Sequence, residues 1–198
     1  MTAVPDRSVF ENAYAGKAPW DIGKPQRTLA AVADRVTGPI LDAGCGTGEH
    51  ALLAAAHGAN AAGMDISPRA IGRAREKAAE RGLTARFEVA DALDLGPLGL
   101  TFDTVIDSGL FHVFDDPDRA RYVTSLAAAL EPGGTCYLMC FSDRQPGDFG
   151  PRRVSRDELT EAFGGDGWAV DAITADTFGV SAQLGSIAQA WLATIRRT

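Results

Sequence analysis

The sequence predicts an α/β fold built on a seven-stranded, mostly parallel sheet with helices on both faces. Short apolar segments alternate with segments of helical character, which is the pattern of consecutive strand–helix–strand units. Four of the apolar segments end in an aspartate, and a glycine-rich turn separates the first of them from a helix. The 198 residues suit one domain. We expect a core over residues 37–198, preceded by an arm over residues 1–36 that belongs to the same domain.

The first half of the core supplies four expected strands, which cover residues 39–42, 61–65, 85–90 and 102–106. A helix over 49–57 follows the glycine turn, because that segment is rich in Ala and Leu. Ser67 and Pro68 begin the next helix, since Ser is a favoured N-cap and Pro is favoured in the first turn. Gly82 ends that helix.

The second half predicts two further helices and three strands. A helix over 117–130 stops at Pro132-Gly133-Gly134, and a strongly apolar strand follows over 135–141. Ser155 and Glu158 form a capping-box pattern that begins a helix to residue 163. Strands over 168–175 and 187–195 complete the sheet as an antiparallel pair, joined by a loop over 176–186 that we expect to be exposed.

The arm contains a turn-rich stretch over 15–25 and a helix from Gln26, whose apolar residues fall on one face. Phe10 and Tyr14 are four residues apart on a possible earlier helix. This spacing brings two side chains together. They either line a substrate site or form a purely structural pair.

The turn over 44–48, Gly-Cys-Gly-Thr-Gly, is the strongest functional signal, because it follows a strand and opens a helix. A dinucleotide fingerprint needs a further glycine at position 49, where this chain has Glu, and the lysine of a phosphate-binding P-loop is missing. The acids that end the four strands meet at one edge of the sheet. Four carboxylates repel a pyrophosphate and favour a ligand with a sulfonium and an amino group, which predicts S-adenosylmethionine.

Positions along the chain assign roles at this site. Asp65 follows Gly44 at the spacing of an acid that binds ribose hydroxyls. Asp91, beside Ala92, is placed to receive the adenine amino group, and Asp42 orients the glycine turn or faces the cofactor amine. The expected cofactor site comprises Asp42, Gly44, Cys45, Gly46, Gly48, Asp65, Ile66, Asp91, Ala92, Asp107 and Ser108.

Residues 40–48, Asp65, Asp91 and residues 130–134 together resemble class I S-adenosylmethionine-dependent methyltransferases. The resemblance implies a Rossmann-like core and S-adenosylhomocysteine as product. Residues 18–26 are similar to a segment of thiol, halide and thiopurine methyltransferases. They are closer still to bacterial enzymes that methylate small heterocycles such as hydroxyquinolones. This second resemblance implies that the arm folds over the cofactor and that Trp20 touches it.

These observations predict methyl transfer to an O, N or S atom of a small soluble, aromatic or heterocyclic molecule. A thiol or halide acceptor is one alternative, and a non-catalytic S-adenosylmethionine-binding partner protein is another. His112 follows the fourth strand at the crevice, so it lines the acceptor pocket, takes a proton from the acceptor, or is structural. His50 and His57 lie on the first core helix and are expected to be surface or structural residues.

Charge and hydropathy limit the partners that the protein can have. The formal net charge of −7 disfavours nucleic acid, which requires a basic surface. No apolar segment is long enough to span a membrane and the first residues do not form a signal peptide, so we expect a cytoplasmic monomer or homodimer. Asp115 and Asp116 precede Pro117 and are expected to start a helix, not to bind a metal.

Overall fold

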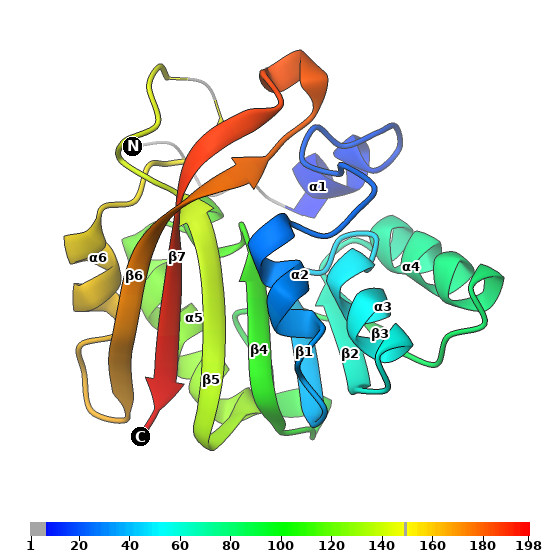
Figure 1. The fold of residues 1–198 in the computed structure, drawn as a ribbon, viewed down its shortest axis with the longest axis horizontal. Helices are drawn as coiled ribbons and strands as arrows, with labels where there is room; N and C mark the ends of the chain where they lie inside the picture. The colour runs from blue at the N-terminus through cyan, green and yellow to red at the C-terminus, as the bar shows by residue number, and fades with distance from the viewer. Residues whose placement is uncertain (1–6, 149) are drawn as a thin grey trace.

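The computed structural model describes residues 7–148 and 150–198. Seven strands form one sheet in the order β3-β2-β1-β4-β5-β7-β6, in which β7 runs antiparallel to its neighbours β5 and β6 (Figure 1). The strands are β1 Pro39–Ala43, β2 Asn60–Asp65, β3 Arg86–Val89, β4 Phe102–Ser108, β5 Leu130–Phe141, β6 Trp168–Gly179 and β7 Ile187–Arg197. The α/β fold with a mostly parallel sheet is confirmed.

Helices cover both faces of this sheet (Figure 1). The α-helices are α1 Arg7–Ala13, α2 Arg27–Ala33, α3 Glu49–Ala56, α4 Pro68–Glu80, α5 Asp116–Ala129 and α6 Arg156–Ala162. Short 3-10 turns occur at η1 Gly96–Leu98, η2 Phe111–Val113 and η3 Ala182–Leu184. None of the described helices is long and apolar enough to cross a membrane.

The core consists of two layers, because successive residues of a strand point to opposite faces of the sheet. Ile40 and Leu41 are both 1% exposed, yet they belong to different buried clusters. Ile40 packs in the cluster that contains Leu29 and Leu52, from α2 and α3. Leu41 packs in the cluster that contains Leu126, from α5. The sheet is therefore buried on both sides, as parallel sheets usually are.

The expected helix starts are confirmed by their caps. The Ser67 side chain accepts a hydrogen bond from Ala70 N, and Pro68 lies in the first turn of α4. Ser155 and Glu158 form a complete capping box at α6. Asp115 caps α5 by accepting from Asp118 N. Asp115 and its neighbour therefore begin a helix, as the sequence indicates.

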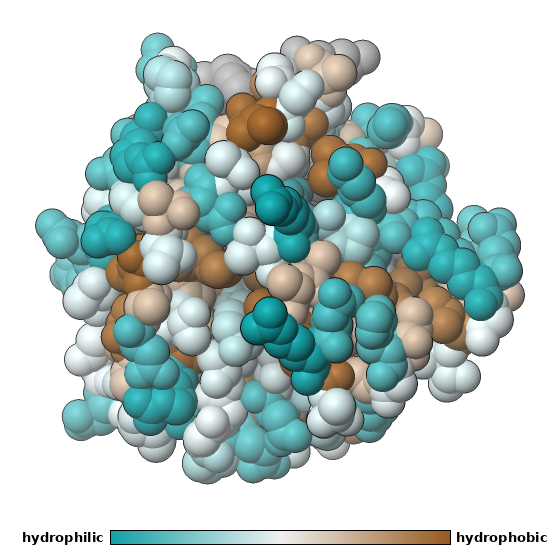
Figure 2. All heavy atoms as spheres, viewed as in Figure 1, coloured by the Kyte–Doolittle hydropathy of each residue, from teal (hydrophilic) through white to brown (hydrophobic). Residues whose placement is uncertain are grey.

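The segment between the last two strands differs from the expectation of an exposed loop. Strand β6 continues to Gly179, and the β6–β7 hairpin arches over the carboxyl end of the sheet toward α1 (Figure 1). Phe178 and Val180 in this hairpin are 4% and 7% exposed. They are buried because the hairpin packs on the sheet end, a long-range contact that local composition does not reveal. In Figure 2, hydrophobic residues are visible at the top near this hairpin and in several smaller patches elsewhere, between hydrophilic residues that cover much of the visible face.

Candidate functional site

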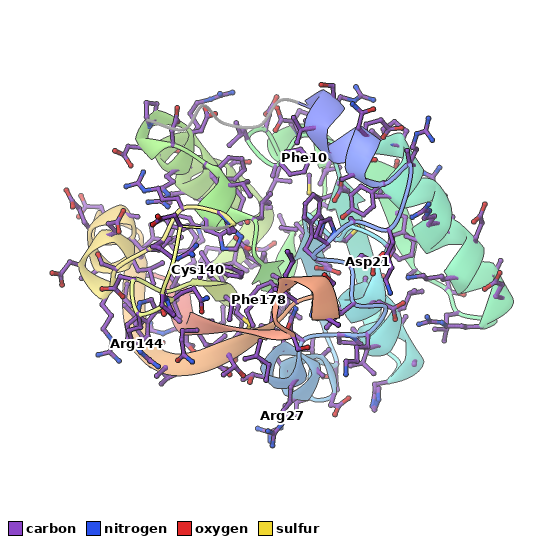
Figure 3. The ribbon with its side chains drawn as sticks, turned by 90° about the horizontal axis from the view of Figure 1, so that it is seen from above. Phe10, Asp21, Arg27, Cys140, Arg144 and Phe178 are labelled. Atoms are coloured by element: carbon purple, nitrogen blue, oxygen red, sulfur yellow. The ribbon has the colours of Figure 1, made fainter. Side chains whose placement is uncertain are left out.

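A cavity of about 680 Å³ lies at the carboxyl ends of the strands, between the arm, the glycine turn, η2 and the β6–β7 hairpin. Figure 3 looks down on this end of the molecule, with Phe10 on α1 and Phe178 on β6 at different sides of it. The structure brings most of the expected site residues to the cavity wall: Phe10, Tyr14, Trp20, Gly44, Cys45, Gly46, Asp65, Ile66, Asp91, Ala92, Ser108 and His112.

Asp65 at the end of β2 ties the glycine turn to the sheet. Its Oδ2 atom accepts a hydrogen bond from Gly46 N at 2.9 Å, and its Oδ1 atom accepts from Ser67 N at 2.8 Å. Gly46 has φ +52°, and a Cβ atom there would lie 2.6 Å from Tyr14 Oη, so only glycine suits this position. Burial raises the pKa of Asp65 to about 6.

Asp91 and Ala92 form the neighbouring part of this wall, after β3. Asp91 is exposed, and its Oδ1 atom accepts a hydrogen bond from Leu93 N at 2.9 Å. Ala92 is 7% exposed. The carboxylates of Asp65 and Asp91 are therefore both at the cavity, on neighbouring strand ends, as the spacing predicts.

The prediction that Asp42, Gly48 and Asp107 line the cofactor site is corrected, because the structure places these residues behind the cavity wall and not in it. Asp42 is 1% exposed and its Oδ2 atom accepts from Ala51 N at 3.3 Å, so it holds the start of α3. Gly48 has φ +85°, and a Cβ atom there would lie within 2.9 Å of Phe87 and Ala74. Asp42 and Gly48 therefore support the glycine turn and the start of α3 from behind the wall, which for Asp42 is one of the two roles expected from the sequence.

Asp107 has a similar supporting role beneath η2. Its oxygens accept hydrogen bonds from Leu110 N at 2.7 Å, Phe111 N at 3.1 Å and Tyr122 Oη at 3.1 Å. It is fully buried, and burial raises its pKa to about 7. Asp107 thus fixes the turn that carries His112, while the next residue, Ser108, lies at the cavity.

The arm closes one side of the cavity through an aromatic cluster. Trp20 Nε1 donates to Tyr14 Oη at 2.9 Å, and the Phe10 and Trp20 rings meet edge to face with centroids 6.1 Å apart. Tyr14 is 4% exposed, and burial raises its pKa well above its usual range. Phe10 and Tyr14 are therefore both a packed pair and part of the cavity wall.

Polar contacts bind the arm to the core at several points. Glu11 accepts from Ser67 Oγ and from Arg69 Nε. Thr47 Oγ donates to Asp21 Oδ2 at 3.1 Å, so the arm also bonds to the glycine turn. These contacts were not expected from the sequence, because each joins residues 26 or more positions apart.

Gln26 connects the arm to the β6–β7 hairpin. Its side chain both donates to Gly179 O at 3.0 Å and accepts from Gly179 N at 2.7 Å. Its backbone N–H donates to His50 Nε2 at 3.0 Å. His50 is 7% exposed, so it is a structural residue, in line with one of the two expectations for it. His57 is on the surface, with a side chain that is 46% exposed.

Known proteins share this fold and much of this sequence. A family model described as a methyltransferase domain matches residues 40–134. The 2-heptyl-1-hydroxyquinolin-4(1H)-one methyltransferase of Mycobacteroides abscessus is 38% identical over 181 residues, which cover 85% of this chain and 79% of that protein. A structure from a study of the conversion of a disulfide bond into a thioacetal group during echinomycin biosynthesis is 38% identical, with a TM-score of 0.86 over 97% of this chain and 93% of that one.

The chain belongs to the class I S-adenosylmethionine-dependent methyltransferases. The magnesium protoporphyrin IX methyltransferase ChlM of Synechocystis PCC 6803, solved with bound S-adenosylmethionine, has the same fold at 18% identity, with a TM-score of 0.74 over 100% of both chains. The cofactor of this methyltransferase is S-adenosylmethionine and the product is S-adenosylhomocysteine, as the sequence predicts. S-adenosylmethionine supplies a methyl group that is already activated by the positive charge on sulfur.

The residues of the methyltransferase fit that cofactor. The glycine turn offers close backbone approach, and Asp65 and Asp91 offer carboxylates to hydroxyl and amino groups. Cationic side chains are missing from the turn itself, Gly44 to Gly48, in keeping with a ligand that has no phosphate. Among the described residues, no group of three or more His, Cys, Asp or Glu side chains is placed to hold a metal ion.

Aromatic rings form the part of the cavity wall around His112. His112 is 6% exposed and lies against Phe141 and Phe178, with ring centroids 5.1 and 6.1 Å away. Sequence reasoning missed Phe141 and Phe178 as wall residues. The strongly apolar strand that ends at Phe141 was the signal for one of them, since the residue at the carboxyl end of a parallel strand faces the site.

Proposed function

We propose that this methyltransferase acts on an O, N or S atom of a small planar aromatic or heterocyclic molecule. The observation that supports this most is the aromatic lining of the cavity, where Phe141 and Phe178 pack on His112 and Phe10 lies on the wall that the arm supplies. Aromatic rings favour flat apolar ligands, through stacking and edge-to-face contact. The hydroxyquinolone relative, at 38% identity, acts on a molecule of this class.

The arm and the core are proposed to act as one domain. Residues 7–36 supply walls of the same cavity that residues 37–198 supply, and Trp20, 40% exposed, covers its edge. We propose Trp20, Gly44, Cys45, Gly46, Asp65, Ile66, Asp91, Ala92 and Ser108 as the cofactor contacts. Phe10, Tyr14 and His112 are the proposed acceptor contacts.

A thiol or halide acceptor is the second candidate. The apolar wall supports it, since a thiolate needs desolvation and alignment but little further help. We further propose that the protein is a cytoplasmic monomer or homodimer. The net charge of −7 supports the proposal that it does not bind nucleic acid.

A panel of acceptors tests the proposed function. Hydroxyquinolones, phenols, thiols and iodide would each be incubated with the enzyme and S-adenosylmethionine, and release of S-adenosylhomocysteine would be measured. We expect turnover of the ring-borne hydroxyls. Turnover confined to simple thiols or iodide would instead support the second candidate, and mass spectrometry of the product identifies the methylated atom.

A further inference from the structure

We propose that the methyl acceptor binds as an anion and that His112 donates a hydrogen bond to it. This inference rests on the proposed function. The sequence alone left His112 open as a proton acceptor. The contacts around its ring point to the opposite polarity, because they determine which nitrogen carries the proton.

The backbone N–H of Phe141 donates to His112 Nδ1 at 3.0 Å. An N–H group can only donate, so Nδ1 must carry a lone pair, and the neutral ring then has its proton on Nε2. No described residue forms a hydrogen bond with Nε2, and His112 lines the cavity. Nε2–H is therefore the polar group that the ring presents to a ligand.

Gly109 keeps the space beside Nε2 open. It has φ +86° and also lines the cavity, and a Cβ atom on it would lie 3.2 Å from His112 Nε2. Any other residue would crowd the one donor on this ring. An acceptor atom can therefore approach Nε2–H from the cavity.

The surroundings of His112 keep its ring neutral and favour negative charge beside it. Burial lowers the pKa of His112 to about 3, and the cations Arg119 and Arg153 act in the same direction. Arg119 lies over the Phe111 ring at 4.6 Å and Arg153 over the Phe141 ring at 5.5 Å. The carboxylate of Asp107, the nearby acid, is turned to Leu110 N, Phe111 N and Tyr122 Oη.

The Phe141 and Phe178 rings that pack on His112 from β5 and β6 are uncharged. The two charged groups that lower the pKa of His112 are both positive, and Arg119 is also paired with Glu158, with 3.1 Å between its Nη1 atom and Glu158 Oε1. Arg119 and Arg153 disfavour an imidazolium, and they favour an oxyanion beside the ring. A neutral Nε2–H donor in this field suits the deprotonated hydroxyl of an aromatic ring. The same group is unsuited to remove a proton, since its Nε2 lone pair is absent.

The chemistry that follows needs no proton transfer within the site. The acceptor oxyanion forms a bond to the methyl carbon with one lone pair, while the carbon–sulfur bond breaks and its electron pair stays on sulfur. An anion and a sulfonium thus become a neutral ether and a neutral thioether. The acceptor loses its proton to solvent before it binds, so the rate follows the ionised fraction of the acceptor.

Two substitutions separate the functions of the ring nitrogens. His112→Asn can keep an acceptor for Phe141 N–H through its Oδ1 atom but removes the donor at Nε2. His112→Gln reaches the Nε2 position with an amide N–H and so restores the donor. His57→Asn is the matched control, since His57 is a surface residue outside the cavity. Calorimetric titration with S-adenosylhomocysteine checks that every variant retains the cofactor site.

The readout is kcat/KM against pH for two hydroxylated aromatics of similar shape. One is phenol, with a pKa near 10, and the other is a nitrophenol that is ionised at neutral pH. We expect the inflection of the plot of kcat/KM against pH to lie at the pKa of the acceptor, and therefore to differ between the two acceptors. In His112→Asn the inflection should stay at the same pH, while the plateau value of kcat/KM falls about 10–150-fold. His112→Gln should recover most of the plateau, and His57→Asn should match the wild type.

An inflection common to both acceptors that disappears in His112→Asn would show a proton acceptor and overturn the inference. An unchanged plateau in His112→Asn would overturn it as well. A wild-type enzyme that binds S-adenosylhomocysteine but methylates no aromatic acceptor would overturn the proposed function, and the inference with it.

Discussion

Asp65, at the end of β2, accepts a hydrogen bond from the glycine turn and also lines the cavity. Its substitution by Ala removes the acceptor for Gly46 N and the carboxylate that we propose binds the cofactor in the cavity. We expect Asp65→Ala to weaken S-adenosylhomocysteine binding by about 1.5–3 kcal/mol, the range for hydrogen bonds to a charged group. Calorimetric titration measures this, with Asp94→Ala as control, because Asp94 is exposed and outside the cavity. An unchanged dissociation constant in folded Asp65→Ala would contradict the assigned role.

Asp107 makes the stability of the protein depend on pH. Its folded-state pKa is about 7, above the usual value near 3.9, so between about pH 4 and 7 the folded state holds a proton that the unfolded chain has lost. Its contribution to the unfolding free energy is therefore lost as the pH rises through this window. We expect the stability difference between wild type and Asp107→Asn to fall by about 2 kcal/mol from pH 5 to pH 8.

Urea unfolding of both proteins at the two pH values measures that difference. The comparison is made against the variant because burial lowers the pKa of His112, which gives an opposite trend that both proteins share. A difference that is flat or grows with pH would show that Asp107 is ionised in the folded protein.

Whether an individual residue lies at the cavity was predictable from the sequence only where its position along a strand determines this. Asp65 ends β2 and Asp91 lies two residues beyond β3, and both do reach the cavity. Asp107 also ends an apolar run, but successive residues of a strand face opposite sides, and Ser108 is the one at the cavity. The sequence does not specify which of two adjacent residues takes that side, because the partner of Asp107 is Tyr122 on α5.

At the scale of elements, Gln26 joins the start of α2 to the β6–β7 hairpin. It is 5% exposed, and Gln26→Ala would leave both Gly179 N and Gly179 O without their partner. We expect a loss of about 1–3 kcal/mol in the unfolding free energy, the cost of unsatisfied buried groups, with a raised KM for the acceptor. Arg27→Ala is the control, since that side chain points away from the molecule in Figure 3. Equal stabilities of the two variants in urea would show that the hairpin does not depend on this contact.

The elements themselves were largely predictable, since each of the seven strands contains an apolar run. One boundary was wrong, because α5 ends at Ala129 and β5 begins at Leu130, so that Pro132-Gly133-Gly134 lies within the strand and not in a turn before it. Caps and proline fixed the starts of α4 and α6 because these are local interactions. The hairpin tip was misjudged because its Gly and Ser content indicates exposure. Only contact with the sheet end buries Phe178 and Val180. Such contacts depend on residues more than a hundred positions away, as Gln26 and Gly179 show.

At the scale of the whole molecule, we expect cofactor binding to raise the free energy of unfolding. The cavity that we propose for S-adenosylhomocysteine is lined by the arm, the glycine turn and the strand ends, and it exists only when they are assembled, so binding should stabilise the folded state. At one hundred times its dissociation constant we expect a gain of about 2.7 kcal/mol, or about 5–10 °C in Tm. NAD at the same concentration should leave Tm unchanged, because the acids at the site oppose a pyrophosphate. A rise in Tm with NAD and none with S-adenosylhomocysteine would reverse the cofactor assignment.

Strand β7 is the last strand in the chain but not the last in the sheet, since it lies between β5 and β6 and pairs with both. On the ribosome, β6 therefore emerges before the strand that joins it to the rest of the sheet. A nascent chain that stops before Ile187 has no neighbour for β6 and no return limb for the hairpin that supplies Phe178. The cavity wall that includes Phe178 is accordingly complete only after β7 has been translated and has paired with both neighbours.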